Sequence, residues 1–206
     1  MSEAGFEPVR KLSVPDSVDA FDCGQPALNQ FLQRYALVNR QANSAQTYVC
    51  CLNGIVAGFY SLAVGSVDPE SASPRVMKGL ARHPVPVMIL ARLAVDHAHQ
   101  RKGLGQALLR DALLRTVQAA DIAGIRALLV HAKDEAARQW YESWEFEPSP
   151  IDSFHLFLML KDLKVLLRRK LGSDSKSFPP ADQTFSSLRS SGCLSRRLNR
   201  YRCAAV

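Results

Sequence analysis

The chain has 206 residues, of which 47% are hydrophobic, enough for one α/β domain with a substantial core and too few for two large ones. No apolar run approaches the roughly 18–20 residues that span a bilayer, and residues 1–5 lack the basic start and apolar stretch of a secretory signal. These features predict a soluble, cytoplasmic protein without a membrane contact.

The net charge of +7 is concentrated near the end of the chain. Residues 1–168 hold 18 Lys and Arg against 17 Asp and Glu, whereas residues 169–206 hold 8 against 2. We therefore expect one domain over residues 1–167 and a basic, Ser-rich tail over residues 168–206 that lacks stable structure. The charge alone does not establish that the domain binds nucleic acid.

The first half of the chain predicts a strand, helices and a hairpin. Residues 9–12 form a short β-prone run, and Pro26 opens a stretch with helical apolar spacing. Residues 47–52 and 55–62 are β-prone runs separated by Asn-Gly, which is typical of a β-hairpin. The proline-rich residues 66–87 then read as a connector.

The second half alternates strands and helices. Residues 87–95 and 125–130 are apolar runs typical of interior strands, and a helix is expected to begin at Gly103. Asp134 is a good N-cap for a helix over residues 135–144. A last strand is expected over residues 154–160.

The loop between the strand 87–95 and the helix that follows has the composition of an anion site. Glycines allow a close backbone approach, the N-terminus of the helix carries partial positive charge, and two basic side chains add full charges. The sequence lacks the third glycine of a dinucleotide-binding fingerprint and the Gly-Lys-Ser/Thr of a P-loop. The predicted site consists of Gln100, Arg101, Lys102, Gly103, Leu104 and Gly105.

With its flanking strand, this loop resembles the pyrophosphate loop of GNAT N-acetyltransferases. Gln100-x-x-Gly103-x-Gly105 matches the family motif, and Leu93-Ala94-Val95 matches the splayed strand whose backbone pairs with pantetheine. The resemblance implies an α/β (α+β) GNAT fold, whose central sheet is mixed and mostly antiparallel with helices on both faces. It also implies acetyl-CoA as co-substrate, bound at the splayed strand pair.

Further motifs resemble one branch of the family, the TacT/AtaT-like toxins of type II toxin–antitoxin systems. These motifs include Phe21-Asp22-Cys23-Gly24, Leu28-Asn29, Arg92-Leu93-Ala94-Val95-Asp96 and Ala132-Lys133-Asp134-Glu135-Ala136. The resemblance implies acetylation of the α-amino group of aminoacyl-tRNA, inhibition of translation and neutralisation by a ribbon-helix-helix antitoxin. It further implies operator DNA binding through the antitoxin complex, and as oligomeric state either a homodimer or a toxin–antitoxin complex.

Tyr141 is the residue that the resemblance marks for catalysis, within Asp134-x-x-Ala137-x-x-x-Tyr141. The sulfur that leaves a thioester needs a proton, and a tyrosine hydroxyl can supply it as a general acid. Asp134 belongs to the same motif and is expected near the cofactor. Glu145 departs from the family, which has glycine before the phenylalanine, and a left-handed backbone there would cost about 1 kcal/mol.

A tRNA substrate requires exposed positive charge around the site. The candidates are Arg92, Lys133, Arg34, Arg40, Arg75, Lys78 and Arg82, whose spacing does not by itself define a patch. His97 and His99 lack further ligands at metal spacing, and the five cysteines are scattered, so no metal is expected.

Two other functions remain open at this level. The same fold and cofactor would serve an enzyme that acetylates a protein or small-molecule amine. A non-catalytic CoA-binding protein that acts with an antitoxin on operator DNA is the second alternative.

Overall fold

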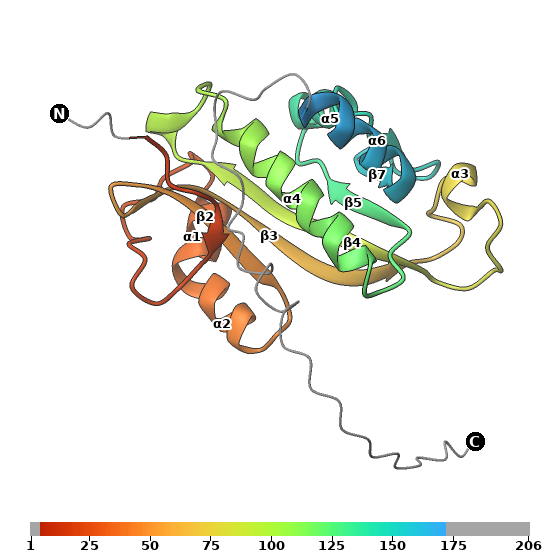
Figure 1. The fold of residues 1–206 in the computed structure, drawn as a ribbon, viewed down its shortest axis with the longest axis horizontal. Coiled ribbons are helices and arrows are strands. Elements are labelled where there is room, and N and C mark those ends of the chain that lie inside the picture. Colours follow the sequence, from red (N-terminus) through yellow and green to blue (C-terminus); the bar gives the residue numbers. More distant parts are fainter. Residues whose placement is uncertain (1–4, 172–206) are drawn as a thin grey trace, which may run out of the picture.

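The computed structural model describes residues 5–171 and forms a sheet of seven strands covered by helices (Figure 1). The order is β1-β2-β3-β4-β5-β7-β6, and β4 and β5 are the one parallel pair among the described strands. The bounds are β1 (Arg10–Lys11), β2 (Gln46–Leu52), β3 (Ile55–Val67), β4 (Val85–Val95), β5 (Ala127–His131), β6 (Glu147–Pro148) and β7 (His155–Met159). The expected mixed and mostly antiparallel sheet is confirmed.

Helices pack on both faces of this sheet. They are α1 (Pro26–Gln30), the π-helical η1 (Phe31–Tyr35), α2 (Ala36–Gln41), α3 (Pro74–Met77), the 3₁₀ turn η2 (His97–His99), α4 (Leu104–Ala120), α5 (Glu135–Glu142) and α6 (Leu160–Leu171). In Figure 1, α1 and α2 lie on one side of the β3 and β4 ribbons, and α4 lies on the other.

Three apolar clusters fill the space between helices and sheet. The largest joins α4, α5 and α6 to the sheet, because the apolar rows of α4, such as Leu104, Leu108 and Leu109, face it. The opposite face carries two smaller clusters, one under η1 and α2 around Phe31 and Phe59, the other under α3. The sheet is therefore the middle layer of the molecule.

The hairpin of β2 and β3 has the predicted turn, since Asn53 and Gly54 both have positive φ, 52° and 77°. The proline-rich connector was expected to be irregular, but β3 continues to Val67 and α3 lies within it. α6 was not predicted as a helix and crosses the expected domain boundary at residues 167/168. The remainder of the predicted tail lies outside the described residues.

Within residues 5–171, no helix is long and apolar enough to cross a membrane.

Candidate active site

The opening of the sheet at β4 results from an irregularity in strand pairing. Leu62 pairs with Leu90 and Ser61 pairs with Arg92, so Ala91 forms a β-bulge. The pairing of β4 with β5 ends at Leu90 and Val130, and beyond that point β4 continues to Val95. The strands therefore diverge, and backbone groups of Arg92–Val95 face a gap instead of β5.

The predicted anion loop lies directly after this stretch. Arg101 and Gly103 adopt positive φ, 60° and 83°, and Gly103 is the N-cap of α4. Arg101, Lys102 and Gly103 are exposed, whereas Leu104 is buried in the core and anchors the helix start. Since the first backbone N–H groups of an α-helix have no partner within it, they are available to an anion here.

Gln100 has a different environment from the rest of the loop. Its side-chain amide donates to the Val95 carbonyl at 3.0 Å and to the Cys23 carbonyl at 3.3 Å. The amide nitrogen is therefore engaged by the protein itself.

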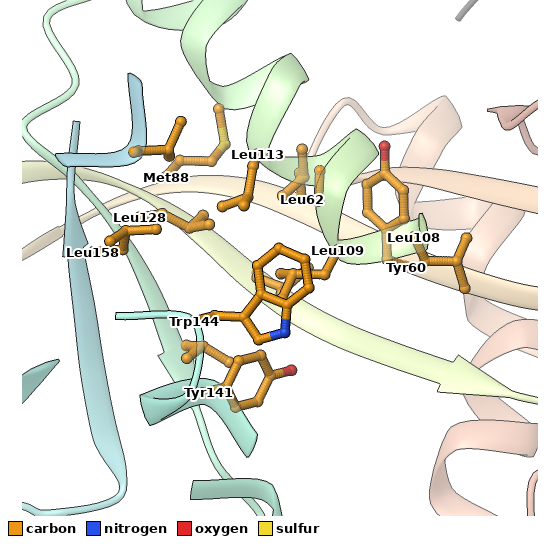
Figure 2. Close-up of a cluster of buried hydrophobic side chains, with 14 of the residues drawn as sticks. Tyr60, Leu62, Met88, Leu108, Leu109, Leu113, Leu128, Tyr141, Trp144 and Leu158 are labelled. Carbon is orange, nitrogen blue, oxygen red and sulfur yellow. The ribbon is translucent and has the colours of Figure 1, made fainter. Parts of the chain in front are cut away.

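Tyr141 lies at the edge of the largest cluster, 7% exposed, with its ring against Trp140 and Phe146. Figure 2 shows the hydroxyl pointing away from Leu128 and Leu158. Burial raises the pKa of this hydroxyl well above its ordinary value, so the group stays protonated at neutral pH. The hydroxyl therefore carries a proton at neutral pH, but its raised pKa also makes it a weaker acid.

Asp134 is the N-cap of α5, as predicted, and accepts a hydrogen bond from the Ala137 N–H at 2.8 Å. That bond, followed by the nearby Lys133, lowers the pKa of the carboxyl. Lys133 forms an exposed ion pair with it at 3.2 Å. The carboxylate thus fixes the beginning of the helix that carries Tyr141.

A diverging strand followed by a basic, glycine-containing helix start matches a known family. The family model of the acetyltransferase (GNAT) domain matches residues 43–148, just over half of the chain. The chain belongs to the GNAT acetyltransferase family. Members of this family use acetyl-CoA as the acetyl donor.

Known GNAT proteins similar to this chain include toxins. The tRNA-acetylating toxin of Mycobacterium tuberculosis (strain ATCC 25618 / H37Rv) is 45% identical over 164 residues, 80% of this chain and 98% of the toxin. AtaT complexed with acetyl-methionyl-tRNAfMet superposes with a TM-score of 0.72 at 27% identity, covering 78% of this chain and 98% of AtaT. A tyrosine-to-phenylalanine mutant of AtaT, bound to the C-terminus of the antitoxin AtaR and acetyl-CoA, gives 0.67 at 26%, covering 78% and 97%.

The basic residues predicted around this GNAT site have unequal environments. The Arg92 guanidinium lies 4.1 Å from the centre of the Phe31 ring, and Arg34 is exposed beside a surface groove of about 800 Å³ along α1 and η1. Arg40 donates to the Leu12 carbonyl, and Arg75 pairs with Glu147 and Asp162. Lys78 and Arg82 are exposed in the segment between α3 and β4.

Sequence reasoning missed two polar features of the domain. Asp111 of α4 is buried and accepts hydrogen bonds from Tyr60 and from Arg115, the latter at 2.8 Å. An acidic residue among the apolar rows of α4, four residues before an arginine, was the available signal. The rings of His131 and His155 stack at 3.6 Å between β5 and β7, a contact that depends on strand register and leaves no sequence pattern.

No group of three or more His, Cys, Asp or Glu side chains in the described part of the chain is placed to hold a metal ion.

Proposed function

We propose that this GNAT enzyme transfers the acetyl group of acetyl-CoA to the α-amino group of aminoacyl-tRNA and thereby inhibits translation. The observation that carries the proposal is the 45% identity with the tRNA-acetylating toxin, which extends over 98% of that toxin. The likeness to AtaT in a complex with acetyl-methionyl-tRNAfMet supports the same acceptor.

Two parts of the chain would contact acetyl-CoA, and two further side chains would hold elements of the site in place. The backbone of Leu93, Ala94 and Val95, open toward the gap, would pair with the pantetheine amides. The N–H groups of Gly103, Leu104 and Gly105, with the charges of Arg101 and Lys102, would hold the pyrophosphate. Gln100 and Asp134 would act by fixing the loop and α5.

We assign the general-acid role to Tyr141, which would donate its proton to the departing CoA sulfur. The raised pKa makes the buried hydroxyl a weaker acid than the hydroxyl of a tyrosine in water. The same burial disfavours a thiolate in the pocket, so the proton affinity of the sulfur rises as well. The tyrosine regains a proton from the amine nitrogen that has formed the new amide bond.

The acceptor proposal agrees with the lack of an evident base among the residues assigned to the site. An α-amino group has a pKa of about 8, so a useful fraction is neutral at pH 7, whereas a lysine amine at about 10.4 requires deprotonation. An aminoacyl acceptor thus makes a smaller demand on the enzyme than a lysine side chain.

The test is acetyl transfer from labelled acetyl-CoA to a pool of charged tRNA. We expect label on aminoacyl-tRNA, and Tyr141→Phe is expected to lower the rate at least about tenfold because the proton donor is lost while the ring remains. Tyr35→Phe, at an exposed position of η1, is the matched control and should retain the parent rate. Binding of acetyl-CoA without label on RNA would contradict the tRNA proposal and point to a protein or small-amine acceptor.

The biological setting follows from the same relatives. We propose a cytoplasmic toxin, neutralised by a ribbon-helix-helix antitoxin whose complex with the toxin binds operator DNA. The complex of AtaT with the C-terminus of AtaR supports an antitoxin partner. The proposal also includes a homodimer and a catalytic domain over residues 1–167 followed by the basic tail 168–206.

A further inference from the structure

The loop before α4 is held by a segment more than 70 residues earlier in the chain. The Asp22 N–H donates to the Asp96 carboxylate at 3.0 Å, and the His97 N–H donates to the Asp22 carbonyl at 2.8 Å. The Gln100 amide adds the bond to the Cys23 carbonyl at 3.3 Å. Three hydrogen bonds therefore join the segment 22–24 to the loop 96–100.

The segment 22–24 is in turn fixed to α1 by one side chain. The Asn29 amide donates to the Asp22 carboxylate at 2.7 Å, and its oxygen accepts from the Cys23 N–H at 3.0 Å. The Gly24 N–H donates to the same Asp22 carboxylate at 2.8 Å, and these bonds lower the pKa of that carboxyl. Asn29 thus bonds to the segment from both ends of its amide.

The loop that receives these bonds needs external support. Between η2 and α4, Arg101 and Gly103 have left-handed backbone, which costs energy at a non-glycine residue. N–H groups bind an anion well only when they are held in place before it arrives, because ordering a loop on binding weakens affinity. The Gln100 amide bridges the end of β4 and the segment 22–24, so it holds the loop on both sides.

We propose that Asn29, Asp96 and Gln100 are positioning residues that act as one network, through which α1 sets the affinity of the loop for the CoA pyrophosphate. The inference rests on the proposed function only in placing CoA at this loop, and it does not depend on the acceptor. It gives the Phe21–Gly24 and Leu28–Asn29 motifs a role in cofactor binding without contact to the cofactor.

The experiment measures the Kd of free CoA by calorimetry on the full chain. Gln100→Met keeps the side-chain length and removes the donor, and Asn29→Ala removes the remote link. We expect each to raise the Kd about fivefold to tenfold, the equivalent of one or two lost hydrogen bonds. If the residues form one network, the Kd of the double variant should be about equal to the higher of the two single-variant Kd values.

Matched controls separate this effect from a general loss of stability. Gln118→Met on α4 and Gln30→Ala on α1 change exposed side chains and should leave the Kd within about twofold of the parent. Thermal unfolding is recorded for all variants. If Asn29→Ala lowers the melting temperature but leaves the Kd unchanged, or if the double variant shows additive losses, the network is refuted.

Measuring CoA binding separately from tRNA labelling keeps the inference distinct from the proposed acceptor. If Asn29→Ala does not fold, Gln100→Met, with its exposed side chain, decides alone. One outcome is that the parent protein fails to acetylate tRNA while the variants still bind CoA more weakly than the parent. That result would support the network and contradict aminoacyl-tRNA as the acceptor. A parent chain that does not bind CoA would overturn the network itself.

Discussion

Glu145 occupies a backbone conformation that suits glycine. Its φ is 65°, in the turn that follows α5 and its C-cap Ser143, where the Phe146 N–H donates to the Tyr141 carbonyl at 3.3 Å. Among the described residues it pairs with Arg169 at 3.5 Å, an exposed contact that contributes little. The departure from glycine noted in the sequence therefore carries a steric cost beside Tyr141.

We predict that Glu145→Gly raises the free energy of unfolding by about 1 kcal/mol, because glycine removes the left-handed strain. Urea denaturation of the parent and the variant measures the difference. Glu145→Ala serves as the control, since it removes the carboxylate and keeps the strain. An equal gain in both variants would show that charge, not backbone geometry, is responsible.

Tyr60 and Asp111 connect β3 to α4 inside the core. The Tyr60 hydroxyl donates to the Asp111 carboxylate, which Arg115 also contacts, and burial raises the pKa of Tyr60 far above its ordinary value. Removing this donor leaves a buried carboxylate with one partner fewer. The pair therefore holds the helix whose N-terminus forms the anion loop.

Tyr60→Phe is predicted to destabilise the protein by about 1–3 kcal/mol, the cost of a lost hydrogen bond to a buried charged group. Chemical denaturation gives the value. Tyr35→Phe at its exposed site should stay within about 0.5 kcal/mol of the parent. A Tyr60→Phe variant as stable as the parent would mean that water or Arg115 fully replaces the hydroxyl.

Elements with strong local signals were predictable, and elements that depend on distant partners were not. The Asn-Gly turn, the apolar run of β4 and the caps of α4 and α5 appear in the sequence because local chemistry specifies them. α3 and β6 are too short to show a period. α6 begins directly after the apolar strand β7. In the sequence its leucines therefore look like a continuation of that strand, and no separate helix is evident.

The site shows the same division. The glycine-containing loop was evident from its sequence motif. The hydrogen bond from Gln100 to the Cys23 carbonyl could not be predicted in this way, because it joins residues 77 positions apart in the chain. The gap beside β4 depends on a single bulge at Ala91, which a run that is apolar except for Arg92 does not reveal. The resemblance to a family therefore located the site, and the structure shows how it is held together.

Across the molecule, the predicted tRNA-binding arginines differ in whether they form ion pairs with carboxylates of the protein. Within residues 5–171, Arg34 has no ion pair, whereas Arg75 binds two carboxylates. Under the proposed function, a domain nearly neutral over residues 1–168 would contact RNA phosphates through those cations of the described residues that are not paired with carboxylates.

Arg34→Gln is predicted to raise the KM for every charged tRNA alike and to reduce the slope of log KM against log salt by about 1, the loss of one phosphate contact. Initial rates at several salt concentrations supply the slope. Arg75→Gln is the comparison and should leave the slope unchanged. The opposite pattern would place the RNA on the α3 side of the molecule.

The bulge at Ala91 also restricts how the chain can change in length. Before it, Val87 faces the cluster under α3 and Leu90 the cluster under α4; after it, Ala94 faces the helices η1 and α2. Because Leu90 and Arg92 already face opposite sides of the sheet, deleting Ala91 would leave the faces of Arg92 and Leu93 unchanged but would remove the bulge that opens the gap beside β4. In descendants of this gene, residue types at position 91 can vary, but insertions and deletions between Leu90 and Val95 should be purged.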